Sequence, residues 1–376
     1  MVGPIAPAAF LSLLAVPALA VIDSPESFEQ WVQTHGKRYE TKALREQAET
    51  TFMANSEAIA GLRRAEGGSA EYGHTCFGDL SPREFQRSRL PRMDAAEGLR
   101  GGKAPEFAGL REDPPAEIDW RTQGAVTPVK DQASCGSCWA ESAVANIESV
   151  WYLANKASMS VPVALSVEQV IECDAHDNAC YGGFPKGAYR YAIEHGGLAA
   201  AADYPYRVGG HTICLANQTF NATCGDGICS DPPLTSSCDL TCSDRAHRSV
   251  ARISSWVALP ESESRIASYL AAHGPVSVGM DASGGALGVL FPWLQFYKRG
   301  IASPGRCTDT IDHGVLLVGY GEEAGKKYWT VKNSWGTKWG EAGYFRIIRG
   351  LAKCGIDKMA TSAVVKSADL REAIVV

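Results

Sequence analysis

The sequence predicts a protein of the α+β class, with a helical N-terminal unit ahead of a larger body. The chain has 376 residues, of which 45% are hydrophobic and 21% charged. This composition is typical of globular proteins and excludes disordered, collagen-like and coiled-coil chains. The length exceeds the roughly 100–200 residues of one ordinary domain, so we expect two or three units. Apolar residues recur at helical spacing from Phe28 to about Leu62 and again after Cys138.

The N-terminal unit contains a second helix signal and ends in a linker. Ser81 is placed as the N-cap of this second helix, and Pro82 as its first residue. Residues 92–115 are rich in Gly, Ala, Pro and charged side chains, which is typical of an exposed linker. The economical interpretation is two units joined by a cleavable linker.

The first 20 residues predict a secretory signal peptide, cut after Ala20. Met1–Ala20 contains no charged side chain, and its apolar stretch ends in the small-residue pattern Ala18-Leu19-Ala20. An uncleaved membrane anchor, the alternative, needs about 20 apolar residues, and prolines interrupt this stretch. No later stretch is long enough to span a bilayer. We therefore expect a soluble mature protein of the secretory pathway, in a lysosome or vacuole or outside the cell.

Charge and cysteine content narrow the class of protein further. The net charge is −6, and no run of Lys and Arg is longer than a doublet. Because phosphate binding needs a concentrated basic face, a nucleic-acid partner is not expected. Twelve cysteines are too many for a reducing cytosol without a metal or redox explanation, so they favour an oxidising compartment.

The densest chemistry of the chain surrounds Cys138. Residues 132–140 read QASCGSCWA, and apolar residues then follow at helical spacing as far as Trp151. Cys138 is therefore expected on the first turn of a long, mostly buried helix. Unpaired N–H groups at a helix N-terminus stabilise a thiolate over a thiol, so this position suits a nucleophile. A single cysteine on an apolar helix, taken alone, is more often a core residue.

Three sequence blocks carry a family resemblance. They are DWR, GAVTPVKDQ and CGSCWA within residues 119–140, IDHGVLLVGYG at residues 311–321, and VKNSWG, WG and GY within residues 331–344. Together and in this order they resemble the papain family of cysteine proteases, in its cathepsin L-like branch, over about Phe28 to Val365. The resemblance implies a preproenzyme with a papain-like fold of two subdomains. The left domain would be helical and led by the Cys138 helix, and the right domain an antiparallel, β-barrel-like sheet.

The resemblance also implies a reaction and its residues. Cys138 would be the nucleophile, His313 its ion-pair partner and general acid, and Asn333 the residue that orients the imidazole. Gln132 would supply the side-chain half of an oxyanion hole. The thiolate attacks a peptide carbonyl, the imidazolium protonates the leaving amine, and water hydrolyses the thioester. The implied activity is a cysteine endopeptidase that needs no cofactor.

The same resemblance implies an uncharged S2 pocket in the substrate cleft. Gly182 and Gly183 would let a peptide backbone approach closely and pair as an added strand. We expect preference for an apolar P2 residue and, without an occluding-loop histidine pair, endopeptidase activity. The residues expected to bind substrate are Gly182, Gly183, Phe184, Pro185, Gly279, Ile311, Asp312, Gly314, Trp335 and Met359.

The cysteines divide into family pairs and an insertion. The resemblance pairs Cys135 with Cys180, Cys173 with Cys214, and Cys307 with Cys354. The family lacks an insertion at about residues 215–247, a segment longer than ordinary loops. We favour two disulfides in it over a zinc or calcium site, so no metal is expected. The insertion holds Cys224, Cys229, Cys238 and Cys242; glycosylation sequons begin at Asn217 and Asn221; and Cys76 is left over.

Position 141 departs from the family, which usually places Phe where this chain has Glu141. The residue lies three positions after Cys138, among apolar neighbours. A buried carboxylate without a partner is costly, so we expect Glu141 to be hydrogen-bonded, paired or protonated. A structural substitution with its own partner is favoured. The sharper hypothesis is that Glu141 tunes the pH profile of the thiolate–imidazolium pair.

Residues 21–112 resemble the family's inhibitory propeptide, with departures at Leu44, Ala48, Arg63 and Thr75. The expected domains are the signal peptide (1–20), the propeptide (21–112) and the peptidase (113–376). The propeptide would pass through the cleft in a non-productive direction and be released by cleavage near residues 111–116 after acidification. The alternative is a helical adaptor with no inhibitory role.

Two other function classes stay open at this stage. Cys135 and Cys138 form a C-x-x-C pattern, which could belong to a thiol–disulfide oxidoreductase. The chain could also be a catalytically silent papain-like binding protein. The favoured interpretation is a monomer with protein and peptide substrates and its own propeptide as inhibitor. The role of the tail, residues 366–376, is not indicated.

Overall fold

The computed structural model describes residues 26–91, 93–105, 114–207, 213–215, 218–220, 248–284, 292–305 and 307–366. The predicted signal peptide lies outside these residues. The chain divides into two compact units, residues 1–38 and 39–376. In the first unit, helix α1 (Phe28–His35) is capped by reciprocal hydrogen bonds between Ser27 and Gln30, and it ends at Gly36 with φ of 64°. The helical pattern of residues 28–62 is thus interrupted after His35.

The second unit begins with three helices. The sequence pattern anticipates the first two, whereas the third, at Ala95–Leu99, lies where an exposed linker is predicted, and that prediction is wrong for these residues. Helix α2 (Lys42–Ala65) buries Ala48, Phe52, Asn55, Ile59 and Leu62 along one face. Helix α3 (Pro82–Arg89) starts as predicted, because Ser81 and Glu84 form a capping box and Pro82 is the first helical residue. Strand β1 (Glu71–Tyr72) lies between them, and the short helix α4 (Ala95–Leu99) follows.

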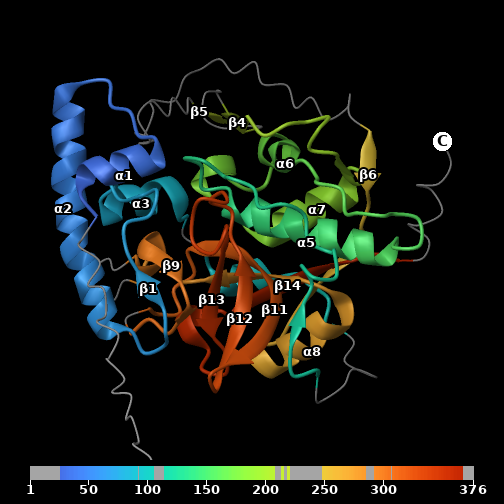
Figure 1. The fold of residues 1–376 in the computed structure, drawn as a ribbon. Helices are drawn as coiled ribbons and strands as arrows, with labels where there is room; N and C mark the ends of the chain where they lie inside the picture. The colour runs from blue at the N-terminus through green and yellow to red at the C-terminus, as the bar shows by residue number, and fades with distance from the viewer. Residues whose placement is uncertain are drawn as a thin grey trace, which may run out of the picture. The chain divides into compact units, whose positions relative to one another are not determined.

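A helical layer covers one side of the body. Helix α5 (Cys138–Ala154) is buried continuously from Cys138 to Tyr152, as its apolar pattern predicts. Figure 1 shows α5 crossing strands β11 and β14. The layer also contains α6 (Val167–Cys173), the 3₁₀ turn η1 (Ala179–Tyr181) and α7 (Pro185–Glu194).

An eight-stranded sheet forms the other side. Its order is β10-β13-β12-β11-β8-β14-β7, with β2 paired to β11. All neighbours are antiparallel except β10 and β13. The strands are β2 (Ile118–Asp119), β7 (Ser255–Ala258), β8 (Val276–Met280), β10 (Ile301–Ala302), β11 (His313–Glu323), β12 (Lys326–Lys332), β13 (Tyr344–Ile348) and β14 (Met359–Val364).

Smaller elements complete the described fold. Strand β9 (Tyr297–Arg299) pairs with β1, β3 (Leu198–Ala199) with β6 (Ser249–Ala251), and β4 (Ile213–Leu215) with β5 (Gln218–Phe220). Helix α8 (Glu263–His273) and the turns η3 (Trp293–Phe296) and η4 (Lys353–Gly355) connect strands of the large sheet.

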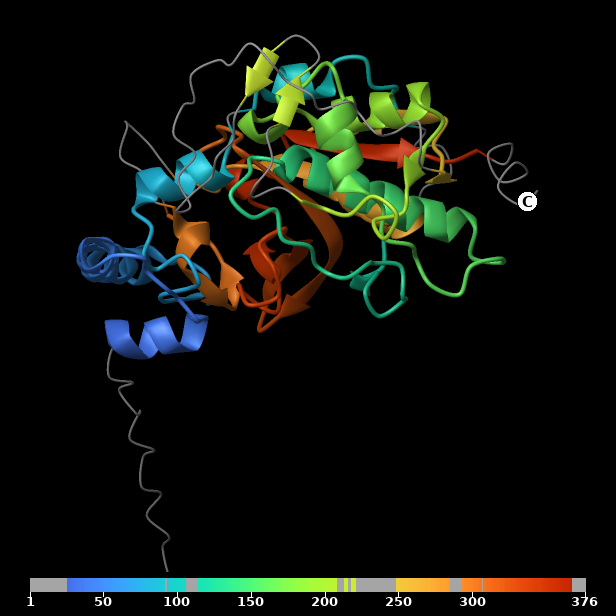
Figure 2. The same cartoon turned by 90° about the horizontal axis from the view of Figure 1, so that it is seen from above.

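Both apolar cores include side chains from the N-terminal segment. The core around α5 contains Met93. The core on the sheet side takes in six such residues, and Figure 2 shows α2 and α3 beside the orange segment that carries β9. The six are Ile59, Leu62, Tyr72, Phe77, Phe85 and Leu90. These side chains, which lie between Ile59 and Met93 of the second unit, are therefore part of its folded core.

Candidate active site

Cys138, the predicted nucleophile, is the first residue of α5 and is fully buried. Burial raises the pKa of its thiol to about 12. Backbone N–H groups of Gly314 and Trp139 oppose this shift, while the carboxylates of Asp312 and Glu141 add to it. In this covered state the side chain is a neutral thiol over the whole physiological range of pH.

His313 opens strand β11, where it lies opposite Met280 of β8. Its Nε2 lies 2.8 Å from Asn333 Oδ1, and because a carboxamide oxygen can only accept, Nε2 carries the proton. Burial lowers the pKa of His313 to about 4, which the hydrogen bond to Asn333 opposes. The ring of Trp335 stacks on the imidazole, with 4.7 Å between centroids.

The strand that carries His313 is in backbone contact with the helix that carries Cys138. A Cβ atom added to Gly314 would lie 2.9 Å from the carbonyl oxygen of Cys138. Only a glycine allows so close an approach without a shift of the backbone. The structure thus brings together the three segments that carry Cys138, His313 and Asn333, which are far apart in the sequence.

Gln132 is held in one orientation beside Cys135. Its Oε1 accepts hydrogen bonds from Ser334 Oγ (2.6 Å) and Trp335 Nε1 (3.0 Å). Its Nε2 donates to the Cys135 carbonyl at 2.7 Å and to the Arg89 carbonyl at 3.2 Å. A donor fixed in this way suits an oxyanion hole, and a carbonyl of the N-terminal segment occupies it here.

Residues 89–91 and Met93 of the N-terminal segment lie along the predicted substrate cleft. Pro91 covers Gly182, where an added Cβ would lie 2.6 Å from the Pro91 Cβ. The backbone N–H of Met93 donates to the Ile311 carbonyl at 2.9 Å. Arg89 is partly buried, and its guanidinium donates to the Ala133 carbonyl.

Four residues of the predicted S2 pocket gather around Gly98 of α4. Both Met359 and Phe184 would contact a Cβ at Gly98, and a Cβ at Gly279 would lie 2.6 Å from Ile311 and from Met359. Pro185 is the first residue of α7, directly after Phe184. Gly183 is in contact with Trp139 and Asp177. The four gathered residues, Phe184, Gly279, Ile311 and Met359, carry no charge.

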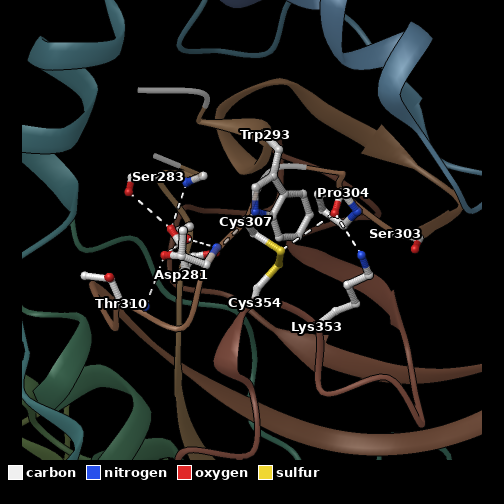
Figure 3. The surroundings of a disulfide bond; sticks show 12 residues. Asp281, Ser283, Trp293, Ser303, Pro304, Cys307, Thr310, Lys353 and Cys354 are labelled. Carbon is white, nitrogen blue, oxygen red and sulfur yellow. Dashed lines mark hydrogen bonds between the residues drawn. A yellow bond between two sulfur atoms is a disulfide. The ribbon is translucent and has the colours of Figure 1, made fainter. Parts of the chain in front are cut away.

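Asp312, the residue directly before His313, has a buried side chain. Its carboxylate accepts hydrogen bonds from the N–H groups of Ala282 (2.7 Å) and Ser283 (3.3 Å). Burial and the nearby carboxylate of Asp281 raise the pKa of Asp312 to about 7. Figure 3 shows Asp281 close to the Cys307–Cys354 disulfide. These contacts fix the segment that leads into β11.

The described disulfides agree with the pairs that the family resemblance implies. Cys135 is bonded to Cys180, and Cys307 to Cys354. Cys135 is therefore not available as the redox partner of Cys138. Cys173 is disulfide-bonded, and Cys76 is half-buried against the core on the sheet side. The side chain of Cys214, the insertion cysteines (Cys224, Cys229, Cys238 and Cys242) and both sequons (Asn217 and Asn221) lie outside the described part of the chain.

Glu141 differs from the favoured expectation. Its side chain is 4% exposed, and its Oε1 has no hydrogen-bond partner among the residues that the structure describes. A structural substitution with its own partner was the favoured interpretation, and it is wrong for this oxygen. Burial raises the pKa of Glu141 to about 7, so the site favours the protonated carboxyl more than water does.

Sequence reasoning did not identify three residues that hold the site together. Ser334 fixes the Gln132 amide, Tyr206 donates its hydroxyl to the Gln132 carbonyl at 2.9 Å, and Arg89 supplies the carbonyl opposite Gln132 Nε2. Ser334 was signalled by its place directly after Asn333. Tyr206 and Arg89 reach the site through tertiary contacts, and no local pattern marks them.

A metal site has no support in the described ranges. No group of three or more His, Cys, Asp or Glu side chains is placed there to hold an ion. The sequence expectation that no metal is needed concerns the insertion as well, which lies outside these ranges.

Comparison with known proteins places this site in a family. The profile of papain family cysteine proteases matches residues 114–364, and that of the cathepsin propeptide inhibitor domain matches residues 28–85. Cathepsin F of Mus musculus is 36% identical over 342 residues, covering 90% of this chain and 64% of its own length. A probable cysteine protease of Arabidopsis thaliana, RD19C, is 33% identical over 366 residues, covering 91% of this chain and 85% of its own.

Solved precursors share the fold. The recombinant stem bromelain precursor superposes with a TM-score of 0.71 at 28% identity and covers 90% of this chain and 98% of its own. Procathepsin L2 of Tenebrio molitor larval midgut gives the same TM-score and identity and covers 90% and 99%. The chain spans about two thirds of mouse cathepsin F and 48% of Drosophila melanogaster cathepsin F.

The chain belongs to the papain family of cysteine proteases and carries the family's propeptide inhibitor domain. Its relatives are named as cathepsins and cysteine proteinases, and the propeptide identifies the chain as a zymogen of the secretory pathway. Among the described helices, none combines the length and apolar character needed to cross a membrane.

Proposed function

We propose that this chain is the precursor of a cysteine endopeptidase whose reaction is carried out by Cys138 and His313. The observation that carries the proposal is the 2.8 Å hydrogen bond from His313 Nε2 to Asn333, on a strand packed tightly against the first turn of α5. The bond leaves His313 Nδ1, which has no described partner, to exchange a proton with the thiol. Gln132 offers a prealigned donor for the oxyanion.

The mechanism follows from these positions. The Cys138 thiolate attacks the peptide carbonyl, and negative charge develops on the carbonyl oxygen beside Gln132 Nε2. The His313 imidazolium then gives its proton to the departing amine, leaving a thioester on Cys138. Water hydrolyses the thioester, with His313 now acting as base. Trp335, stacked on the ring, excludes water from the bond between His313 and Asn333.

The covered site would keep the precursor inactive. With residues 89–91 and Met93 in the cleft, burial favours the neutral forms of both Cys138 and His313. Release of the segment returns water to the cleft and removes that desolvation. The charged pair, stabilised by its own attraction and by the helix N-terminus, then becomes the favoured state.

We infer that the propeptide binds through two segments of different kind. The anchor segment (residues 67–85) pairs β1 with β9 and places Phe77 and Phe85 against Trp335, with centroid distances of 5.6 and 5.2 Å. The cleft segment (residues 89–91 and 93–103) passes Gln132, Gly182 and the S2 residues. The cleft segment blocks the site, and the anchor segment keeps the cleft segment in place.

The pocket around Met359 supports a preference for apolar P2 residues. Phe184, Gly279, Ile311 and Met359 are uncharged; Phe184 and Met359 lie against Gly98, and Met359 also lies against Gly279 beside Ile311. A substrate side chain of moderate size would occupy the place that α4 takes here. Faster cleavage of dipeptidyl substrates with Arg than with Leu or Phe at P2 would refute this preference. Gly182, Gly183, Pro185, Asp312, Gly314 and Trp335 complete the proposed substrate-binding set.

Labelling and mutation test the assignment of the nucleophile. Precursor activated at acid pH should react with an epoxide inhibitor of thiol proteases at Cys138 alone and should hydrolyse a fluorogenic peptide. The Cys138→Ser variant should lose both properties while keeping the fold. Failure of the activated protein to label, or labelling with no hydrolysis, would favour a catalytically silent binding protein.

The remaining expectations are part of the proposal. We propose a monomer, cut between the propeptide and the peptidase near residues 111–116, with the four insertion cysteines in two disulfides. Lysosomal, vacuolar or extracellular residence fits the disulfides and the acid activation. Mass spectrometry of the non-reduced activated protein would test the disulfides.

A further inference from the structure

Glu141 and Asn333 each direct an unpartnered polar atom into the buried region behind the site. Glu141 Oε1 and Asn333 Nδ2 are both buried without a hydrogen-bond partner among the described residues, and the side chains are 4% and 3% exposed. One oxygen can accept and one amide can donate. Leaving both unsatisfied in a protein interior is costly, so the pair needs an intermediary.

Both side chains line one cavity of about 20 Å³. Its other polar lining residues are Lys130, Ser142, Lys332 and Ser334. A single water needs about 10–15 Å³ of such space and two to four polar partners. The volume and the lining therefore fit one water molecule, which can accept from Asn333 Nδ2 and donate to Glu141 Oε1.

The side-chain oxygen of Asn333 is hydrogen-bonded to His313, the predicted general acid. Asn333 Oδ1 accepts from His313 Nε2 and from the Ser334 N–H, each at 2.8 Å. When Asn333 Nδ2 donates a hydrogen bond to the water, the amide is polarised, and Oδ1 becomes a stronger acceptor. The chain of contacts from Glu141 through the water and Asn333 thus ends at the imidazole.

Charged groups surround Glu141 from several elements. Lys130, Lys332, Glu148 and Asp131 act on it electrostatically, and the side chains of Cys138 and Tyr206 respond to its charge. Lys130 is paired with Glu148 at 2.6 Å, and Lys332 Nζ donates to Thr127 Oγ1 at 3.0 Å. Both lysines thus have other partners, and neither forms an ion pair with Glu141 in the described structure.

We propose that Glu141 is a positioning residue which, through one water in this cavity, holds the Asn333 amide and stabilises the His313 imidazolium. The proposal rests on the assignment of Cys138, His313 and Asn333 made above. Glu141 does not touch substrate. It acts on the reaction in two ways. It fixes Asn333 Oδ1, which accepts the hydrogen bond from His313 Nε2, and its carboxylate charge lies behind that oxygen.

The proposal predicts an effect on one limb of the pH profile. Glu141 titrates near pH 7, so it is neutral at the acid limb, where the thiol ionises, and charged at the alkaline limb, where the imidazolium loses its proton. A negative charge behind Asn333 favours the imidazolium and extends activity to higher pH. Removing that charge should therefore move the alkaline limb to lower pH and leave the acid limb in place.

The test uses kcat/KM profiles of enzyme activated from the full-length precursor. Glu141→Gln, which is isosteric and can still bond the water, should shift the alkaline limb down by about half a unit to one unit, with kcat at the optimum retained. Glu141→Phe, which has the residue usual in the family and cannot bond the water, should shift the limb equally. It should also lower kcat about threefold to tenfold with KM unchanged, the range of one hydrogen bond. Superimposable profiles for the three proteins would overturn the proposal.

Two controls separate this role from simpler ones. Glu168→Gln removes another buried carboxyl whose pKa burial raises to about 7, and because Glu168 lines no part of the cavity, both limbs should stay in place. In an Asn333→Ala background, Glu141→Gln should cause no further shift. A full shift in that background would show that the charge acts without Asn333, which contradicts the proposal. Loss of all hydrolysis in Cys138→Ser, measured alongside, keeps the assignment of the nucleophile separate from this result.

Discussion

The anchor segment and the cleft segment of the propeptide contact the peptidase in different ways. The anchor segment packs Phe77 and Phe85 against Trp335. It is also held by backbone and amide hydrogen bonds: Ser69 N–H to the Ile301 carbonyl at 2.7 Å, Gly73 N–H to the Phe296 carbonyl at 2.9 Å, and Gln295 Nε2 to the Leu80 carbonyl at 2.7 Å. Its ion pair, Glu71 with Arg299, is exposed and contributes little.

The cleft segment depends more on charge. Glu97 of α4 is paired with Lys186 of α7, and Arg89 lies 3.7 Å from Asp131. We therefore expect the anchor segment to supply most of the affinity, chiefly through apolar packing and hydrogen bonds, and the carboxylates near the cleft to respond to acid. Three predictions test this expectation.

The largest effect should come from Phe85→Ala in the anchor segment. Phe85 is completely buried and packs on Phe77 and Trp335. Truncating a buried Phe typically costs about 3–5 kcal/mol, so the propeptide should detach at neutral pH and the precursor should hydrolyse peptides there. The measurement is hydrolysis of a fluorogenic peptide at pH 7 over time. Met53→Ala, on the 63% exposed Met53 of α2, is the control, and a precursor of Phe85→Ala as latent as this control would contradict the anchor's role.

A smaller loss is expected from Gln295→Ala. Gln295 Nε2 donates to the carbonyls of Phe77 (3.0 Å) and Leu80 (2.7 Å), and removing it leaves two buried acceptors without this donor, at a cost of about 1–3 kcal/mol. The precursor should activate faster than wild type at every pH, with the pH of half-activation little changed. The activated enzyme should keep its kcat. If the pH of half-activation moved instead of the rate, the anchor would be part of the acid response.

The smallest effect, and the one specific to acid, should come from Glu97→Gln. The hydrogen bond from Lys186 lowers the pKa of Glu97, so this contact stabilises the covered state at neutral pH and is lost as the pH falls through that lowered pKa. The variant lacks the contact at every pH, so half-activation should move to higher pH by a few tenths of a unit. Glu46→Gln removes an exposed pair within α2 and should leave it unchanged. If the pH of half-activation were the same in Glu97→Gln as in wild type, the acid response would have to come from other residues.

Much of the fold could be predicted because local rules and tertiary structure agree. Ser81, Pro82 and Glu84 specify the start of α3 by capping chemistry alone, and the apolar pattern after Cys138 specifies a helix that is buried on all sides. The pattern from Phe28 to Leu62 did not reveal the interruption after His35, since apolar spacing continues across Gly36. Positive φ at a glycine is set by the backbone path and not by side-chain periodicity.

The site was predictable in its residues more than in its electrostatics. Family motifs placed Cys138, His313, Asn333 and Gln132, and the structure brings their segments together. The state of Glu141 could not be deduced, because it depends on a cavity between α5 and the segment after β12. The Arg89 carbonyl opposite Gln132 also depends on a tertiary path that no local pattern encodes.

The shared core on the sheet side has a consequence for folding. Six of its side chains, from Ile59 to Leu90, belong to the segment that activation removes. The peptidase therefore reaches its native state with a hydrophobic surface completed by residues that it later loses. After cleavage, a denatured molecule would have to find the same structure without them. Activation is in this sense a one-way step, because the side chains that complete this surface during folding are no longer attached to the mature enzyme.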